Sequence, residues 1–251
     1  MDLTLSSAVV TGGASGLGAA TARALSQAGA TVFALDLEAS IAGAQAVAGI
    51  VYVEGDVTVA ADVRRLVALA SAELPLRTVV NCAGIGPSMR ILGKQGSHDL
   101  DLYTRVIQIN LIGTFTVLTL AAEAMAAAEP DAQGQRGVII NTASVAAFDG
   151  QIGQAAYSSS KAGIVGLTLP AARDLAQRGI RVNTIAPGVM ETPMIATVSE
   201  EFRTALAAGV PFPQRLGRPV EFAKLVLSII DNDYLNGETI RLDGALRMAP
   251  R

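Results

Sequence analysis

The sequence predicts an α/β fold in which a doubly wound parallel sheet of about seven strands is covered by helices on both faces. Short apolar runs alternate with longer helix-like stretches along all 251 residues. The runs are apolar at every position rather than at every second one, which is typical of strands buried on both faces. The first run leads at once into a glycine-rich turn, residues 11–18. No repeat, linker or change of composition interrupts this order, so we expect a single domain over residues 1–251.

The expected strands, in chain order, are residues 8–10, 31–35, 50–53, 78–80, 138–140, 180–185 and 239–242. Helices are expected at 19–28, 60–72, 111–128 and 155–169, with Arg64 and Arg65 on the solvent side of the second helix.

Two segments break this rhythm. Residues 84–98 are rich in glycine and proline, and residues 190–213 contain Pro193, Pro211 and Pro213. Ligands of open α/β sheets bind outside the carboxyl ends of the strands. We therefore expect both segments to form pocket walls, and 190–213 to form a loop or lid over the substrate.

Composition excludes several classes of function. Hydrophobic residues make up 51% of the chain and charged residues 16%, which predicts a large core and buried subunit interfaces. A net charge of −3 without a basic stripe gives no support for nucleic-acid binding. The threonines and Glu123 within 111–128 favour a packed helix over a membrane span. The first residues lack the pattern of a signal peptide, and we expect a cytoplasmic protein.

The chain has one cysteine, Cys82, and one histidine, His98. This count excludes a disulfide within the chain, makes a zinc site unexpected and weakens any hydrolase triad. We expect no bound metal, a small wall residue at Cys82 and a solvated loop residue at His98.

The glycine-rich turn is placed to bind a dinucleotide, as in a Rossmann-type fold. Glycines allow close approach to a pyrophosphate at the positive end of the following helix. The expected contacts are Gly12, Ser15, Gly16, Leu17 and Gly18.

Asp36 ends the second strand, 18 residues past Gly18. A carboxylate there accepts hydrogen bonds from the adenine-ribose hydroxyls and repels a 2′-phosphate, which favours NAD over NADP. The alternative interpretation of Asp36 is a helix cap.

Two further segments follow strands. Asp56 and Val57 come after the third strand, where the carboxylate of Asp56 would meet the adenine amino group. Small residues follow the fourth strand and suit close contact with a nucleotide: Asn81, Cys82, Ala83 and Gly84.

Tyr157 and Lys161 are four residues apart and share one face of the expected helix. Free tyrosine titrates near pH ~10, and a nearby cation lowers that value towards neutrality. Ser144, thirteen residues before Tyr157, would hydrogen-bond a carbonyl or alcohol oxygen. Together these groups predict proton transfer to or from an oxygen while a hydride joins or leaves its carbon. The alternative is a half-buried tyrosine beside a solvated lysine.

The whole chain resembles the short-chain dehydrogenase/reductase family. The resemblance depends on Thr11-Gly12-x-x-x-Gly16-x-Gly18, Asp56, Asn81-x-Ala83-Gly84, Asn110, Ser144, Tyr157-x-x-x-Lys161 and Pro187-Gly188. It implies that Tyr157 is the general acid/base, that Lys161 lowers its pKa and binds the nicotinamide ribose, and that Ser144 orients the substrate oxygen. It also implies that Asn110 holds a water in the proton relay and that Thr192 bonds the carboxamide. Further implied cofactor contacts are Pro187, Gly188, Val189 and Met190. Cys82 departs from the family, since many members carry asparagine there.

Residues 137–148, 210–217 and 235–245 are similar to a subgroup, the type II 3-hydroxyacyl-CoA dehydrogenases, also called type 10 17β-hydroxysteroid dehydrogenases. This similarity implies interconversion of a 3-hydroxyacyl-CoA and a 3-ketoacyl-CoA with NAD, and some tolerance for hydroxysteroids. The expected substrate contacts are Ser144, Gln151 and Tyr157. The family also implies a homotetramer, with helices 111–128 and 155–169 at one interface. The alternative is that both helices are buried within one subunit.

Other substrates remain open at this point. They include hydroxysteroids, sugar alcohols and 3-ketoacyl groups on a carrier protein. A carrier-protein reductase commonly uses NADP, so Asp36 argues against it. A non-catalytic binding or scaffold protein is a remote alternative, because such members usually lose the tyrosine or the lysine.

Overall fold

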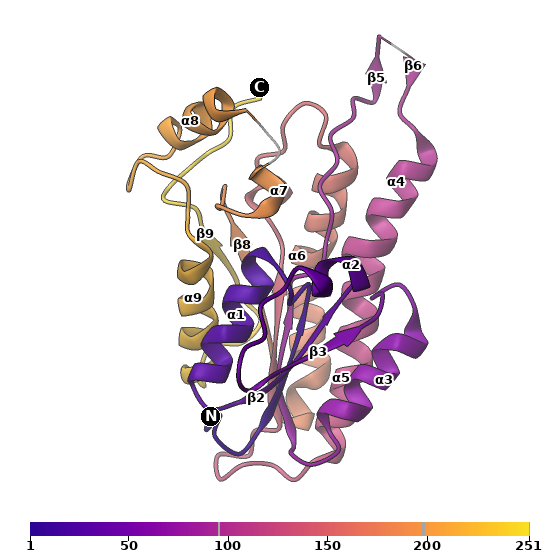
Figure 1. The fold of residues 1–251 in the computed structure, drawn as a ribbon, viewed down its shortest axis with the longest axis vertical. Coiled ribbons are helices and arrows are strands. Elements are labelled where there is room, and N and C mark those ends of the chain that lie inside the picture. Colours follow the sequence, from indigo (N-terminus) through magenta and orange to yellow (C-terminus); the bar gives the residue numbers. More distant parts are fainter. Residues whose placement is uncertain (95, 197–198, 251) are drawn as a thin grey trace.

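The computed structural model describes residues 1–94, 96–196 and 199–250. A parallel sheet runs through the molecule in the order β3-β2-β1-β4-β7-β8-β9 (Figure 1). Its strands are β1 Ser7–Thr11, β2 Thr31–Asp36, β3 Ile50–Glu54, β4 Leu76–Asn81, β7 Gly137–Thr142, β8 Ile180–Pro187 and β9 Thr239–Leu242. All six pairings are parallel, so the α/β prediction is confirmed.

Helices cover both faces of this sheet. Helices α1 (Gly16–Gln27) and α9 (Pro219–Asp231) lie together on one face. The other face carries α3 (Ala60–Ala70), α4 (Leu100–Ile107), a π-helical segment (Gln108–Gly113), α5 (Thr114–Ala127) and α6 (Ala155–Leu175). The short elements are α2 (Glu38–Ala42), α7 (Pro193–Ala196), α8 (Glu200–Ala208) and the 3₁₀ turns Val145–Ala147 and Ala176–Arg178.

Alternate residues of the central strands enter two separate cores. Val9, Val79 and Ile139 occupy one register row and pack under α3 and α5. The next row, Val10 and Val80 among its members, packs under α1 and α9. All of these side chains have no exposed surface. Burial of both faces explains why the strands are apolar throughout.

The continuous helical stretch Leu100–Ala127 is long and apolar enough to cross a membrane by length and composition alone. Its residues Val117, Leu118, Ala121 and Met125 are buried in the core under the sheet. The core helix of a soluble protein can have the same length and hydropathy. The packing of this helix against the sheet is what its threonines led us to expect.

Two predictions need correction, the plain loop at 84–98 and the end of the helix predicted at 155–169. Residues 84–98, expected as plain loop, contain a short antiparallel pair, β5 (Leu92–Gly93) and β6 (Gly96–Ser97). Strands of two exposed residues leave no apolar pattern to find. The predicted lid 190–213 contains α7 and α8, and residues 197–198 of it lie outside the described residues. Helix α6 also continues past Leu169 and through Pro170 to Leu175.

Candidate active site

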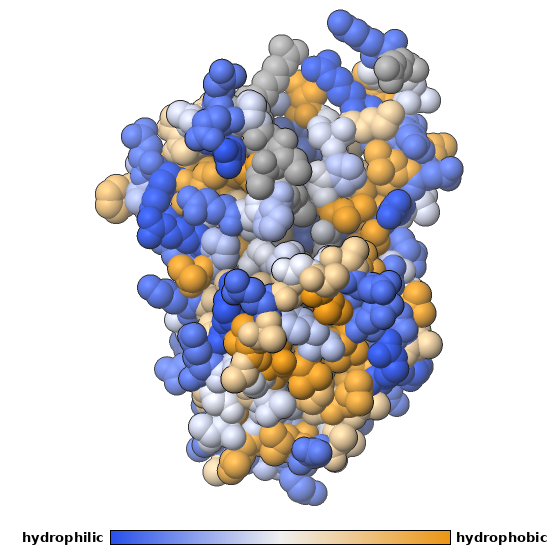
Figure 2. All heavy atoms as spheres, in the orientation of Figure 1, coloured by the Kyte–Doolittle hydropathy of each residue, from blue (hydrophilic) through white to orange (hydrophobic). Residues whose placement is uncertain are grey.

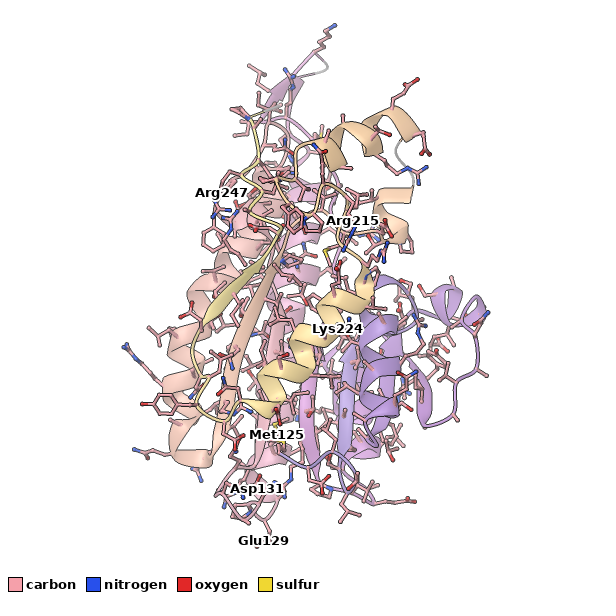
Figure 3. The ribbon with its side chains drawn as sticks, turned by 90° about the vertical axis from the view of Figure 1, so that its left-hand side faces the viewer. Met125, Glu129, Asp131, Arg215, Lys224 and Arg247 are labelled. Atoms are coloured by element: carbon pink, nitrogen blue, oxygen red, sulfur yellow. The ribbon has the colours of Figure 1, made fainter. Side chains whose placement is uncertain are left out.

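The predicted site residues gather at the carboxyl end of the sheet. Helices α7 and α8 and the β5–β6 hairpin all rise above this end (Figure 1). Figure 3 shows Arg215 and Arg247 at this level, whereas Glu129 and Asp131 lie at the opposite end of the molecule. The apolar side chains that Figure 2 shows over β2 and β3 lie away from this end.

Tyr157, Lys161 and Ser144 converge here. Tyr157 and Lys161 lie one turn apart on α6, and Lys161 Nζ is 5.7 Å from the centre of the phenol ring. Ser144 follows β7 as the N-cap of the 3₁₀ turn Val145–Ala147, and a hydrogen bond from Ser144 lowers the pKa of the Tyr157 phenol. Lys161 is buried, and its Nζ donates to the carbonyl oxygen of Thr142 at 2.8 Å. The alternative of a solvated lysine is therefore wrong.

The predicted pKa of this pair needs correction. We expected Lys161 to lower the pKa of the phenol. In the protein alone burial raises the pKa of Tyr157, and the hydrogen bond from Ser144 opposes this rise. Burial also lowers the pKa of Lys161 to about 8. The desolvation of both groups dominates because the ammonium is directed to Thr142 rather than to the phenol oxygen.

Asn110 lies in the π-helical segment, a deformation that is frequent at functional sites. Its Nδ2 donates to the Ile85 carbonyl (2.9 Å) and to Ser160 Oγ (3.0 Å), and its Oδ1 accepts from the Ile85 amide (2.9 Å). Both amide hydrogens therefore have protein acceptors. A water at Asn110 would have to use the remaining lone pair of Oδ1 or the main-chain carbonyl, which already accepts from Thr114 Oγ1.

The glycine-rich turn, residues 11–18, curves around the start of α1 and is called the cradle below. Gly12 and Gly16 have φ of +65° and +50°, a region that favours glycine. A Cβ on Gly12 would lie 3.0 Å from the backbone of Ala83, and one on Gly16 would lie 3.5 Å from Thr192. The turn thus brings Ala83, after β4, and Thr192, after β8, close to the start of α1. Ser15 is the N-cap of α1 and makes no side-chain capping bond, and Leu17 follows in the first turn.

Asp36 fastens this turn to β2. Its Oδ2 accepts from the Ala14 amide at 3.0 Å and its Oδ1 from the Leu37 amide at 2.9 Å. The carboxylate is partly exposed, and each oxygen has lone-pair capacity beyond these bonds. The N-cap residue of α2 is Leu37, so Asp36 itself is not the cap.

Asp56 lies between β3 and α3, where its carboxylate holds the turn that follows it. Its Oδ1 accepts from both the amide and the hydroxyl of Thr58 at 2.8 Å. Asp56 also lines a cavity of about 300 Å³ that reaches α4. Val57 beside it is buried and packs where a Cβ on Gly113 would collide with it.

Hydrogen bonds to the neighbouring strands β1 and β7 hold the segment at the end of β4. Asn81 Nδ2 donates to Asn141 Oδ1 at 2.9 Å, and the amides of Cys82 and Ala83 both donate to Thr11 Oγ1 at 3.2 Å. Burial raises the pKa of the Cys82 thiol to about 11, which agrees with a wall residue and not a nucleophile. A Cβ on Gly84 would lie 3.1 Å from Asn110 Oδ1 and 3.6 Å from Lys161 Nζ.

The segment after β8 closes the other side. Pro187 ends the strand, and the Gly188 amide donates to Leu242 on β9 at 2.9 Å. Gly217 donates to the Val189 carbonyl at 3.0 Å and forms a bridge with Met190. These bonds join the start of the predicted lid to Gly217, just past its far end.

These residues fit a dinucleotide. A helix start and a glycine turn offer backbone N–H donors, and a carboxylate at the end of β2 offers acceptors. The backbones approach so closely that a Cβ on Gly12 would fill the space beside Ala83. Among the described residues no group of His, Cys, Asp or Glu could hold a metal ion. His98 is partly buried and lies edge-on to Tyr103.

Gln151 lines a cavity of about 450 Å³ between residues 90–92 and residues 150–158. Its side-chain Nε2 donates to the Ala249 carbonyl at 2.9 Å, so it is held by the C-terminal segment.

Sequence reasoning missed three residues around the site. Thr142 supplies the acceptor for Lys161, Ser160 bonds Asn110, and Arg90 lines the 450 Å³ cavity. The position of Ser160, on the face of α6 that carries Tyr157, was available as a signal. Thr142 acts through its backbone and Arg90 lies in an irregular segment, so neither has a sequence pattern.

The comparisons with known proteins agree with this geometry. Residues 6–202 match the short chain dehydrogenase family. The 3-hydroxyacyl-CoA dehydrogenase type-2 of Bos taurus is 54% identical over 249 residues, covering 97% of this chain and 95% of the relative. The Drosophila melanogaster protein of that name is 53% identical, covering 96% and 97%. The crystal structure of 3-hydroxyacyl-CoA dehydrogenase type-2 from Mycobacterium avium has a TM-score of 0.93 at 43% identity, covering 99% of this chain and 98% of that one. The present chain is therefore an oxidoreductase of the short-chain dehydrogenase family, which interconverts an alcohol and a ketone by hydride transfer.

Proposed function

We propose that this protein interconverts 3-hydroxyacyl-CoA and 3-ketoacyl-CoA thioesters with NAD as its cofactor. The observation that carries the proposal is the convergence of Tyr157, Ser144 and Lys161 beside the glycine turn. The choice of substrate is supported by the relatives named 3-hydroxyacyl-CoA dehydrogenase type-2, which match 96–97% of the chain.

In this proposal Tyr157 holds the proton that the substrate oxygen gains or loses, and Ser144 orients that oxygen by a hydrogen bond. Bound NAD supplies the hydride acceptor. The raised pKa of Tyr157 keeps the phenol protonated at neutral pH, so the residue is ready to donate in the direction of ketone reduction. Alcohol oxidation needs the phenolate, and its rate is expected to rise with pH.

Lys161 has two parts in the proposal. Its buried Nζ holds the end of β7 through Thr142, which fixes the segment that carries Ser144. Its remaining hydrogens are available to the nicotinamide ribose. Thr192, within contact of Gly16, would receive the carboxamide end of the cofactor.

The preference for NAD is supported by Asp36. Its carboxylate is fixed by two backbone amides at the end of β2. A 2′-phosphate brought to this place would meet a negative charge, while ribose hydroxyls would find acceptors.

The absorbance of NADH at 340 nm, followed with acetoacetyl-CoA, tests the proposal. We expect rapid loss of NADH, and a kcat/KM with NADPH that is lower by at least about tenfold, since each factor of ten needs only ~1.4 kcal/mol of discrimination. Turnover of a hydroxysteroid or a carrier-protein thioester with no turnover of acetoacetyl-CoA would overturn the substrate assignment.

We also propose a homotetramer. Helices α4 and α5 and the π segment between them expose Tyr103, Ile112 and Phe115, and α6 exposes Leu169. Large apolar side chains at 37–50% exposure on neighbouring helices suit a subunit interface. Light scattering that gives the mass of a monomer would contradict this proposal.

A further inference from the structure

We infer that the C-terminal segment, residues 243–250, holds one wall of the substrate site in place, and that Arg241 and Asp149 are positioning residues for that wall. The inference rests on the proposed function for the identity of the substrate. It concerns the loop 148–154, which connects the turn after Ser144 to the start of α6.

This loop forms one wall of the 450 Å³ cavity. Gly150, Gln151 and Ile152 line it opposite Ile91 and Leu92. The loop also packs closely against α6, since there is no room for a side chain at Gly150: a Cβ there would lie 2.6 Å from Ser158 Oγ. A shift of the loop would change the shape of this cavity.

The loop contains no helix or strand, and its own bonds are turn bonds such as the one from the Gln154 amide to the Gln151 carbonyl at 3.0 Å. The C-terminal segment supplies two acceptors to consecutive residues of it. Gln151 Nε2 donates to the Ala249 carbonyl at 2.9 Å, and the Ile152 amide donates to the Pro250 carbonyl at 3.0 Å.

Arg241 on β9 ties the loop, the strand and the C-terminal segment together. Its Nη2 lies 2.6 Å from Asp149 Oδ2, and its Nε lies 2.7 Å from Asp243 Oδ2. Nη2 also donates to the Leu246 carbonyl at 3.0 Å, and the guanidinium lies 5.3 Å from the centre of the Phe148 ring. The partner residue Asp149 is 92 positions away in the chain.

This network is more than a surface ion pair. The side chains of Arg241, Asp149 and Asp243 are 21%, 17% and 7% exposed, so water screens them only in part. Charge-assisted bonds of this length are the stronger kind, and an arginine fork fixes direction as well as distance. Arg247, at the same end of the molecule in Figure 3, adds a second bond to Asp243 at 3.1 Å.

The network therefore holds the wall against which the substrate would lie. Its loss would let residues 148–154 move while the glycine turn after β1 and Asp36 at the end of β2, in the other half of the sheet, keep their own bonds. The expected signature is weaker substrate binding with unchanged binding of NADH.

The test compares Arg241→Gln, Asp149→Asn and a chain ending at Met248 with the wild-type enzyme. Arg65→Gln is the matched control, since Arg65 also pairs with an aspartate but lies exposed on α3. The measurements are KM and kcat for acetoacetyl-CoA, the Kd of NADH, and amide hydrogen exchange over residues 148–154. Arg241→Lys retains the positive charge without the forked guanidinium, so its KM should lie between those of the wild type and Arg241→Gln.

We expect KM to rise at least about fivefold in all three variants, with kcat, the Kd of NADH and the control within about twofold, as is usual for loss of binding without loss of chemistry. Exchange in 148–154 should accelerate. Unchanged exchange, or an unchanged KM with faster exchange, would overturn the inference.

A separate measurement distinguishes this inference from the proposed function. Acetoacetyl-CoA added to the wild-type protein with NAD should slow exchange in residues 148–154, whether or not turnover occurs. Slower exchange without turnover in the NADH assay would refute the proposed function and support the inference. Exchange that acetoacetyl-CoA leaves unchanged would refute the inference even in an active enzyme.

Discussion

Replacement of Gly18 by alanine tests how closely the glycine turn is fitted. Gly18 is buried in the first turn of α1. An added Cβ would collide with the Gly12 carbonyl, lying 2.6 Å from its carbon and 3.1 Å from the Cα of Gly13. An ordinary carbon–carbon contact is about 3.5 Å, so the turn and the helix would have to separate by roughly 1 Å.

Such a displacement has two consequences. Overpacking of a well-packed site costs about 1–3 kcal/mol of stability, which lowers Tm by ~2–4 °C per kcal/mol in a chain of this size. Moving binding groups by about 1 Å costs on the order of a hundredfold where geometry decides function. We therefore expect the Kd of NADH to rise by about ten- to a hundredfold.

Fluorescence titration with NADH and thermal unfolding are the assays. Gly43→Ala is the matched control, because Gly43 has φ −91° and an added methyl group would meet nothing nearer than the Ser40 carbonyl at 3.8 Å. Wild-type NADH affinity together with wild-type Tm in Gly18→Ala would refute the reasoning about the cradle.

Other substitutions have separate outcomes. Asp36→Asn should weaken NADH binding and reduce the NADH/NADPH preference in kcat/KM by about tenfold, because it removes the charge that repels a 2′-phosphate; an unchanged ratio would contradict this. Lys161→Met should abolish most turnover without lowering Tm at pH 7, since burial already lowers the lysine pKa from 10.5 to about 8. Between pH 8 and pH 10.5 Lys161 is protonated in the unfolded chain and neutral in the folded one, so the free energy of unfolding of the wild type relative to Lys161→Met should rise over this range. A difference that does not change with pH would count against burial as the cause of the shift. Arg215 lowers the pKa of Glu221 to about 2, so this carboxylate stabilises the fold above its ordinary pKa of 4.5 and the effect is lost as pH falls towards 2. Glu221→Gln should therefore cost about 1 kcal/mol at pH 7, after allowance for solvent screening, and nothing near pH 2 in urea unfolding.

The sheet could be predicted from sequence because its physical cause is local. Each strand is a short apolar run, and burial on both faces requires every position of Val138-Ile139-Ile140 to be apolar. The glycine turn was predictable for a similar reason, since positive φ at Gly12 and Gly16 leaves few other residues possible.

The electrostatics of the site could not be predicted in the same way. The spacing of Tyr157 and Lys161 places both on one face of α6, but it does not show that both are buried or that Nζ is directed to Thr142. Burial reverses the expected shift in the pKa of Tyr157. Likewise the pair of Arg241 and Asp149 joins residues 92 positions apart, and no local pattern connects them.

The central claim is that the phenol of Tyr157 carries the transferred proton, and Tyr157→Phe tests it most directly. The phenyl ring preserves the shape of the site and removes only the hydroxyl, so we expect the Kd of NADH to stay within about twofold. The kcat for acetoacetyl-CoA reduction should fall by about 10²–10⁴, the usual contribution of a positioned acid or base. A variant that binds NADH normally and reduces acetoacetyl-CoA at the wild-type rate would contradict the account.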